Sequence, residues 1–207
     1  MKSIKHIMLC SLALAASLTA NANNEMNVNE TCSVQNTLNA NAQWTGDATG
    51  FWKVRIGANV KDLPRTQPGL YTSVEKQELD NDEYMYNYLK GDENPFTIIT
   101  NKAGIIKYIT IHMDSDIALS LMGTTVTANT LYHTLMKNQA NKIKWGLKDG
   151  GLVLYLGSQN VYCSPFGFAF TDRGRKKVIR IQETEKLVPI YLSDIQSDVI
   201  LQDIYIE

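Results

Sequence analysis

The sequence has few of the residues and motifs from which common active sites are built. Histidine occurs only three times in 207 residues, and there is no His-Glu-x-x-His and no Cys-x-x-Cys pattern. The Gly-x-Ser-x-Gly elbow, the glycine-rich phosphate loop and the Gly-x-Gly-x-x-Gly pattern are also absent. Zinc sites need clustered His, Cys or carboxylate ligands, and the other patterns mark hydrolase and nucleotide sites. The sequence therefore predicts no metal, no cofactor and no common catalytic motif.

An excess of charge of either sign is absent too. The chain has 20 Lys and Arg residues against 21 Asp and Glu residues, a formal net charge of -1. Nucleic-acid-binding domains carry a clear basic excess, so we expect no nucleic-acid partner. The length suits one compact domain or two small ones.

The only long apolar run lies near the N-terminus, at residues 7–18. It is shorter than the ~20 residues that cross a bilayer, and no later stretch is longer, so we expect no transmembrane segment. Lys2 and Lys5 precede the run and Ala20-Asn21-Ala22 follows it. This is the order of a secretory signal peptide. We expect residues 1–22 to be cleaved after Ala22 and the product to be periplasmic.

The three cysteines leave two questions open. One is whether the N-terminus is lipidated, and the other is whether the two later cysteines form a disulfide. Cys10 lies inside the expected leader and would carry the lipid if the protein were a lipoprotein. Cys32 and Cys163 remain after cleavage, and an even pair in an oxidising compartment favours a disulfide. The alternative is a nucleophilic Cys163 with His112 or His133 as its base, although no local signature supports a lowered thiol pKa.

The chain divides by composition and by a weak internal repeat. Residues 23–50 are rich in asparagine and are expected to form a mobile arm. Two tandem units are expected at 51–118 and 119–185, with C-terminal strands in 186–207. Self-similarity at a fixed spacing is the usual mark of a repeated structural unit.

The repeat rests on two short patterns. Gly-x-x-Val begins at Gly57 and again at Gly123, and Gly-x-x-Lys-x-Ile-x-Ile begins at Gly104 and again at Gly174. We therefore predict an α+β fold, in which two tandem helix-plus-antiparallel-sheet units pack into one compact body.

Apolar periodicity predicts the local elements of each unit. In the second unit we expect a helix over Thr127–Gln139, a hairpin that turns at Asp149-Gly150, and a strand over Val178–Ile181. Pro64 and Pro68 disfavour the corresponding helix of the first unit, because proline lacks a backbone N–H and fixes its φ angle. The strands expected there are Tyr84–Leu89, Phe96–Thr100 and Ile105–His112.

Two groups of side chains are candidate partner surfaces. Five basic residues crowd an expected hairpin that turns at Asp172-Arg173-Gly174. There they offer docking for an acidic partner or an anionic headgroup, or they protect a sheet edge. Three tyrosines at a spacing of two share one strand face, where they form core or an aromatic platform. The two sets are Arg173, Arg175, Lys176, Lys177 and Arg180, and Tyr84, Tyr86 and Tyr88.

Asp114 and Asp116 are the alternative catalytic candidates. They flank Ser115 after an expected strand, where two carboxylates suit acid and base chemistry. A turn whose side chains bond their own backbone gives the same pattern. His112 and His133 have few ligating neighbours in the sequence and are expected to be ordinary surface histidines.

A family resemblance rests on Ile109-Thr110-Ile111-His112-Met113-Asp114-Ser115-Asp116-Ile117, on Gly123-Thr124 and Leu131-Tyr132, and on Val161-Tyr162-Cys163. These segments resemble the small sigma-E-regulated envelope lipoproteins of Gram-negative bacteria, over about residues 104–181. The repeated plan is more loosely similar to tandem beta-lactamase-inhibitor-like modules. The first resemblance implies an envelope protein without known catalysis and supplies no active-site residues.

These observations together predict a non-enzymatic periplasmic protein that binds another protein. It would act in envelope maintenance or as an inhibitor or immunity protein against a hydrolase. The alternatives are a periplasmic hydrolase that uses Asp114 and Asp116 or Cys163, and a carrier of a small ligand.

Overall fold

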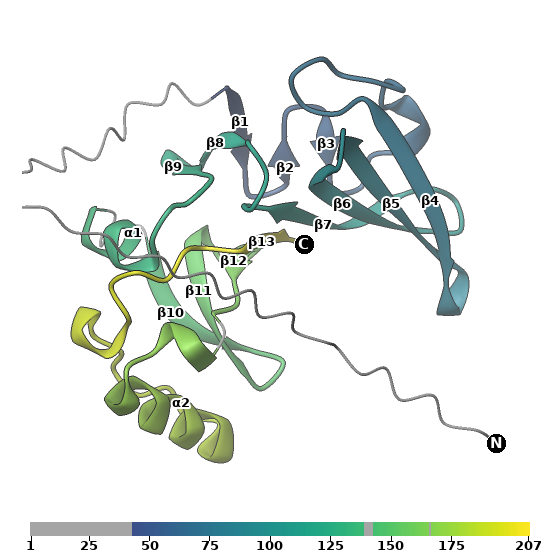
Figure 1. Ribbon diagram of the computed structural model, residues 1–207. Coiled ribbons are helices and arrows are strands. Elements are labelled where there is room, and N and C mark those ends of the chain that lie inside the picture. Colours follow the sequence, from purple (N-terminus) through teal and green to yellow (C-terminus); the bar gives the residue numbers. More distant parts are fainter. Residues whose placement is uncertain (1–42, 139–142, 166) are drawn as a thin grey trace, which may run out of the picture. The chain divides into compact units, whose positions relative to one another are not determined.

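Strands dominate the structure, a computed structural model that describes residues 43–138, 143–165 and 167–207 (Figure 1). An eight-stranded antiparallel sheet has the order β10-β11-β12-β13-β7-β6-β5-β4. Its strands are β4 (Ser73–Leu79), β5 (Glu83–Lys90), β6 (Glu93–Asn101), β7 (Ile106–His112), β10 (Ile143–Lys148), β11 (Gly151–Ser158), β12 (Val161–Cys163) and β13 (Asp203–Ile206).

A five-stranded sheet has the order β3-β2-β1-β8-β9, and its β1–β8 pair is parallel. Its strands are β1 (Trp44–Asp47), β2 (Gly50–Phe51), β3 (Val54–Arg55), β8 (Ala118–Leu121) and β9 (Thr124–Thr127). The α-helices are α1 (Tyr132–Asn138) and α2 (Asp172–Thr184). Four 3-10 turns complete the described chain, η1 (Val60–Asp62), η2 (Asp80–Asp82), η3 (Gly167–Ala169) and η4 (Leu192–Asp194).

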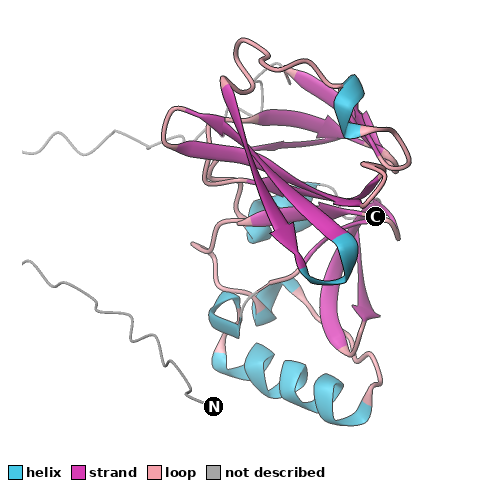
Figure 2. Cartoon of the chain, turned by 90° about the vertical axis from the view of Figure 1, so that its right-hand side faces the viewer, coloured by secondary structure: helices cyan, strands magenta, loops and turns pink. Residues whose placement is uncertain are grey.

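The predicted α+β fold of two tandem helix-plus-sheet units is wrong, because the fold is sheet-dominated (Figure 2). β13 comes from the C-terminal tail and pairs with β7 on one side and β12 on the other. One sheet thus contains strands from both expected units and from the tail. The first expected unit also contains no α-helix.

The two copies of the Gly-x-x-Lys-x-Ile-x-Ile pattern have different structures. The copy that starts at Gly104 runs into β7, whereas the copy that starts at Gly174 lies inside α2. The strand expected over Val178–Ile181 and the hairpin expected around it are therefore wrong. The physical reason is a helix start at Thr171, whose side chain accepts a hydrogen bond from the backbone N–H of Gly174.

Several local predictions are confirmed. β10 and β11 form the expected hairpin, and Asp149 and Gly150 turn it with positive φ angles of 51° and 77°, which suits a two-residue hairpin loop. β5 and β6 cover the first two strands expected in the first unit, and β7 begins one residue later than the third, at Ile106. The predicted helix over Thr127–Gln139 is shorter than expected, because α1 begins only at Tyr132.

Part of the core lies between the two sheets, and part lies between α2 and β11. Phe51 of the five-stranded sheet contacts Phe96 of β6 edge to face, with ring centroids 5.3 Å apart. β7 buries Ile109 and Ile111 and turns Thr110 and His112 to its other face, as the pleat of a strand requires. The eight-stranded sheet therefore has one apolar face and one face that carries polar side chains.

The expected leader at residues 1–22, Cys10 and Cys32 lie outside the described residues. The expected arm, residues 23–50, is described only from residue 43, and β1 forms there rather than a mobile segment. Within the described ranges, neither α-helix has the length and apolar character needed to cross a bilayer.

Candidate functional site

The five basic residues of the expected hairpin all lie on α2. Thr171 caps the helix N-terminus, and Asp172 in the first turn suits the positive end of the helix dipole. α2 packs against β11 and η4 and buries Gly174 and Ile181. Its other side chains are half-buried or exposed. The helix thus presents its basic residues on a surface rather than at a sheet edge.

A buried carboxylate holds α2 in place. Asp194 is fully buried, and its Oδ2 accepts hydrogen bonds from Lys177 Nζ at 2.6 Å and from the backbone N–H of Tyr191 at 2.8 Å. Arg173 Nε lies 3.1 Å from Asp194 Oδ1. Burial raises the pKa of Asp194, but the bonds from Lys177 and Tyr191 and the charges of Lys177 and Arg173 outweigh it, so the pKa is lowered. Asp194 therefore stays ionised and joins α2 to η4.

Close packing at Gly174 adds to this anchor. A Cβ atom at Gly174 would lie 2.1 Å from the carbonyl oxygen of Asp194. Only glycine lets the helix approach the η4 backbone this closely. α2 is therefore held against η4 by an ion-pair cluster and by close backbone contact.

Lys176 and Arg180 are the basic residues left for a partner. Arg173 and Lys177 pair with Asp194, and Arg175 pairs with Asp172. In the part of the chain that the structure describes, no carboxylate forms an ion pair with Lys176 or Arg180.

Exposed apolar side chains accompany these two charges. Ile179, Leu187 and Tyr191 are exposed by 52%, 46% and 55%. A hollow of about 290 Å³ on one side of α2 is lined by Lys176, Lys177, Arg180, Val188, Pro189 and Tyr191. A second hollow, of about 530 Å³, includes Ile179 in its wall. We call Lys176, Ile179, Arg180, Leu187 and Tyr191 the α2 surface.

The structure does not join the three tyrosines to the α2 surface. Tyr84, Tyr86 and Tyr88 lie on β5, which pairs with β4 and β6. Tyr88 is buried and stacks on Phe96, with ring centroids 4.3 Å apart. Tyr84 and Tyr86 are half-buried, and Lys76 Nζ lies 3.6 Å and 5.6 Å from their ring centroids. Tyr88 is therefore a core residue, and Lys76 covers the other two rings.

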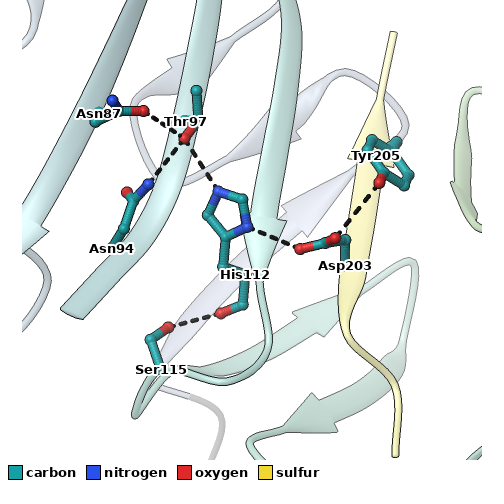
Figure 3. A network of polar contacts seen from close by, with 7 residues as sticks. All are labelled: Asn87, Asn94, Thr97, His112, Ser115, Asp203 and Tyr205. Atoms are coloured by element: carbon teal, nitrogen blue, oxygen red, sulfur yellow. Dashed lines mark hydrogen bonds and ion pairs between the residues drawn. The ribbon is translucent and has the colours of Figure 1, made fainter. Parts of the chain in front are cut away.

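His112 is the centre of a network of polar side chains on the polar face of the eight-stranded sheet (Figure 3). Its Nδ1 lies 2.7 Å from Asp203 Oδ1 on β13, and its Nε2 lies 3.0 Å from Thr97 Oγ1 on β6. The Tyr205 hydroxyl donates to Asp203 Oδ2 at 3.4 Å. Ser115 Oγ donates to the His112 carbonyl at 2.6 Å. The imidazole thus links three neighbouring strands.

A hydroxyl, an imidazole and a carboxylate in a row also occur in serine hydrolases. Here the Thr97 side chain is buried, with 8% of the residue exposed, and its hydroxyl donates to Asn87 Oδ1 at 2.9 Å. The Thr97 hydroxyl is therefore enclosed by its side-chain partners. The described contacts tie β6, β7 and β13 together through the Thr97, His112 and Asp203 side chains.

The two aspartates of the alternative catalytic prediction lie beside this network. Asp114 is exposed and lines a hollow of about 370 Å³ together with His112 and Glu93. Asp116 points into solvent, 3.7 Å from Lys90 Nζ. Over the described ranges, no three His, Cys, Asp or Glu side chains come close enough together to hold a metal ion.

Cys163 is fully buried on β12, and its Sγ donates to the Leu154 carbonyl at 3.6 Å. Burial raises the pKa of the thiol to about 12, so a thiolate does not form near neutral pH. His133 lies half-buried on α1. Because Cys32 is outside the described residues, the disulfide between Cys32 and Cys163 stays a prediction.

Sequence reasoning missed the carboxylates that organise both sites. Asp194 lies 17 residues from Lys177 along the chain, and no local pattern marks it as buried. Asp203 lies 91 residues from His112. Its position two residues before Tyr205 was the one available signal, because alternate residues of a strand share a face.

Comparison with protein-family models, with curated proteins and with solved structures finds no match. The resemblance to sigma-E-regulated envelope lipoproteins and to beta-lactamase-inhibitor-like modules therefore stays a prediction.

Proposed function

We propose that this protein binds an acidic segment of a protein partner through the α2 surface and carries out no catalysis itself. The supporting observation is that Lys176 and Arg180, which have no ion-pair partner in the described ranges, line a hollow together with the exposed Tyr191. The exposed Ile179 lies on the same helix, which has a buried anchor. Interfaces combine apolar contact with complementary charge in this way.

The fixed position of the α2 backbone strengthens this proposal. Asp194, Lys177 and the close contact at Gly174 fix the position of α2 before any partner arrives. A preorganised surface loses less conformational freedom on binding, which improves affinity for a given contact area. The partner would approach the ridge of α2 and insert apolar side chains into the hollows beside it.

The signal-peptide pattern extends the proposal to the compartment. After export, the protein would meet its partner in the periplasm, as a component of envelope maintenance or as an inhibitor of a hydrolase. An acidic partner also suits an electrostatically guided encounter, because complementary charge raises the association rate.

The experiment is a fluorescence anisotropy titration with a labelled peptide of glutamate, leucine and one tryptophan. We expect saturable binding that weakens with added salt, because exposed charges are screened. The K176E/R180E double variant is expected to weaken it by at least about 10-fold. A peptide with lysine in place of each glutamate is expected not to bind.

The matched control is the K61E/R65E variant. It reverses one lysine and one arginine at the same spacing on exposed positions in η1 and just after it, so it has the same net charge as K176E/R180E. The control is expected to bind like the wild type. Equal losses in both variants would show that net charge alone drives binding and would contradict the proposal.

A further inference from the structure

β4 is an open edge of the eight-stranded sheet. It pairs with β5 through an unbroken register from Ser73–Leu89 to Leu79–Glu83. No strand of the described ranges pairs with its other edge. All its residues are exposed except Leu79, which is half-buried. Open edges of regular strands are ready templates for another strand, and proteins usually shorten, bulge or cover them.

Among the described residues, only the charges of β4 itself protect this edge, and these charges alternate in sign along one face. Lys76 and Glu78 are on one face, opposite Tyr86 and Tyr84 of β5. The Lys76 ammonium lies over the Tyr84 ring, which keeps its charge on this face. Glu75 is on the other face, because neighbouring strand residues alternate.

We infer that β4 pairs antiparallel with the β4 of a second copy of this chain, about a two-fold axis at Gln77. Because this axis is perpendicular to the sheet, the same face of β4 lies on the same side of the joined sheet in both copies. It places Lys76 opposite Glu78 of the other copy, and Glu78 opposite Lys76 of the other copy. Opposite charges across a strand pair stabilise the pairing, and like charges oppose it.

Charge selects this register over its neighbours. A two-fold axis at Lys76 would place that lysine opposite its own copy, and an axis at Glu75 would place two glutamates opposite each other. Both put like charges in direct contact. The register at Gln77 leaves only a neutral side chain on the axis and makes two favourable pairs, so a second copy is complementary to β4.

Pairing of one strand edge buries less than the ~1,600 Å² of a standard interface. The dimer is therefore weak and forms at high protein concentration. The inference does not depend on the proposed function of the α2 surface, because α2 packs against β11 and η4 whereas β4 pairs with β5.

Sedimentation velocity of the purified full chain over a concentration series tests the pairing. The wild type is expected to dimerise, and K76E and E78K are each expected to weaken dimerisation by at least about 10-fold, because each creates like-charge pairs. The charge-swapped K76E/E78K variant is expected to restore it. An equimolar mixture of K76E and E78K is expected to form a heterodimer, because one strand then carries two glutamates and the other two lysines.

Two controls make the result decisive. The E75K variant changes a charge on the other face, opposite Leu79 of the second copy, and is expected to dimerise like the wild type. Circular dichroism of each variant checks that the sheet is folded. A wild type that stays monomeric at every concentration overturns the inference. A K76E/E78K variant that does not dimerise also overturns the inference. So does loss of the dimer in K176E/R180E but not in K76E or E78K.

Discussion

The Gly-x-x-Lys-x-Ile-x-Ile pattern occurs at β7 and at α2, but it leads into a strand in the first region and lies in a helix in the second. In β7, Ile109 and Ile111 lie two residues apart on the buried face of a strand. In α2, the equivalent residues are Ile179 and Ile181, of which Ile181 is buried and Ile179 is exposed by 52%. Residues two apart point to nearly opposite sides of a helix. The shared pattern therefore builds core in one region and an exposed surface in the other.

The difference between these regions explains why a candidate site exists at α2. A strand with the α2 sequence would place Ile179 and Ile181 on one face and Lys176 and Arg180 on the other. As a helix, the sequence places Ile179 next to Lys176 and Arg180 on the outside. Thr171 and Asp194 select the helix, since one caps its start and the other pairs with Arg173 and Lys177.

The largest expected difference is between Ile109→Ala and Ile179→Ala, which alter equivalent positions of the pattern. Ile109 is almost fully buried, so its truncation should lower the free energy of unfolding by about 4 kcal/mol. Ile179→Ala should change it by less than about 0.5 kcal/mol because the side chain is exposed. Urea unfolding of both variants measures this difference. Equal losses would mean that Ile179 is buried.

The next effect concerns the anchor of α2. Asp194→Asn removes the charge that holds Arg173 and Lys177 and should lower the free energy of unfolding by about 3 kcal/mol at neutral pH. The folded pKa of Asp194 is below its ordinary 3.8. The stabilisation is therefore fully present above that value and is lost as the pH falls through the folded pKa.

Unfolding curves of the wild type and Asp194→Asn as a function of pH test this account. The gap between the two proteins should be constant near neutral pH and should shrink below pH 3.8. A gap that widens on acidification would contradict the assignment of Asp194 as an ionised anchor.

The smallest effect compares the glycines that begin the two patterns. Gly174→Ala should lower the free energy of unfolding by about 2 kcal/mol, because the new Cβ would meet the Asp194 carbonyl at 2.1 Å. Gly104 has a φ of +80° and its Cβ would lie 3.1 Å from Asn59 Oδ1, so Gly104→Ala should lower it by about 1 kcal/mol. Thermal unfolding ranks the two. A stabilised Gly174→Ala would show that α2 does not contact η4 closely.

Alternating apolar residues made several strands of this fold predictable from the sequence. The hairpin of β10 and β11 and the strands β5, β6 and β7 have regular apolar spacing and the right turn residues, and these are properties of neighbouring residues. β4 escaped prediction because an exposed edge strand buries no alternating apolar row. Thr171, three residues before Gly174, was a helix-start signal that the strand-like Ile-x-Ile spacing outweighed.

The sites were less predictable than the strands. The basic residues of the α2 surface were visible as a charge cluster, but which of them remain available depends on Asp194, and that follows from tertiary packing. The same holds for Thr97 and Asp203, which meet His112 only after three strands have paired.

The most direct test of the central claim is an amide NMR titration of the labelled protein with the acidic leucine-containing peptide. The account predicts saturable shift changes at Lys176, Ile179, Arg180, Leu187 and Tyr191, with the amides of β5 and of the His112 network unchanged. Shift changes that instead centre on His112 and Asp114, or that are absent at saturating peptide, would contradict it.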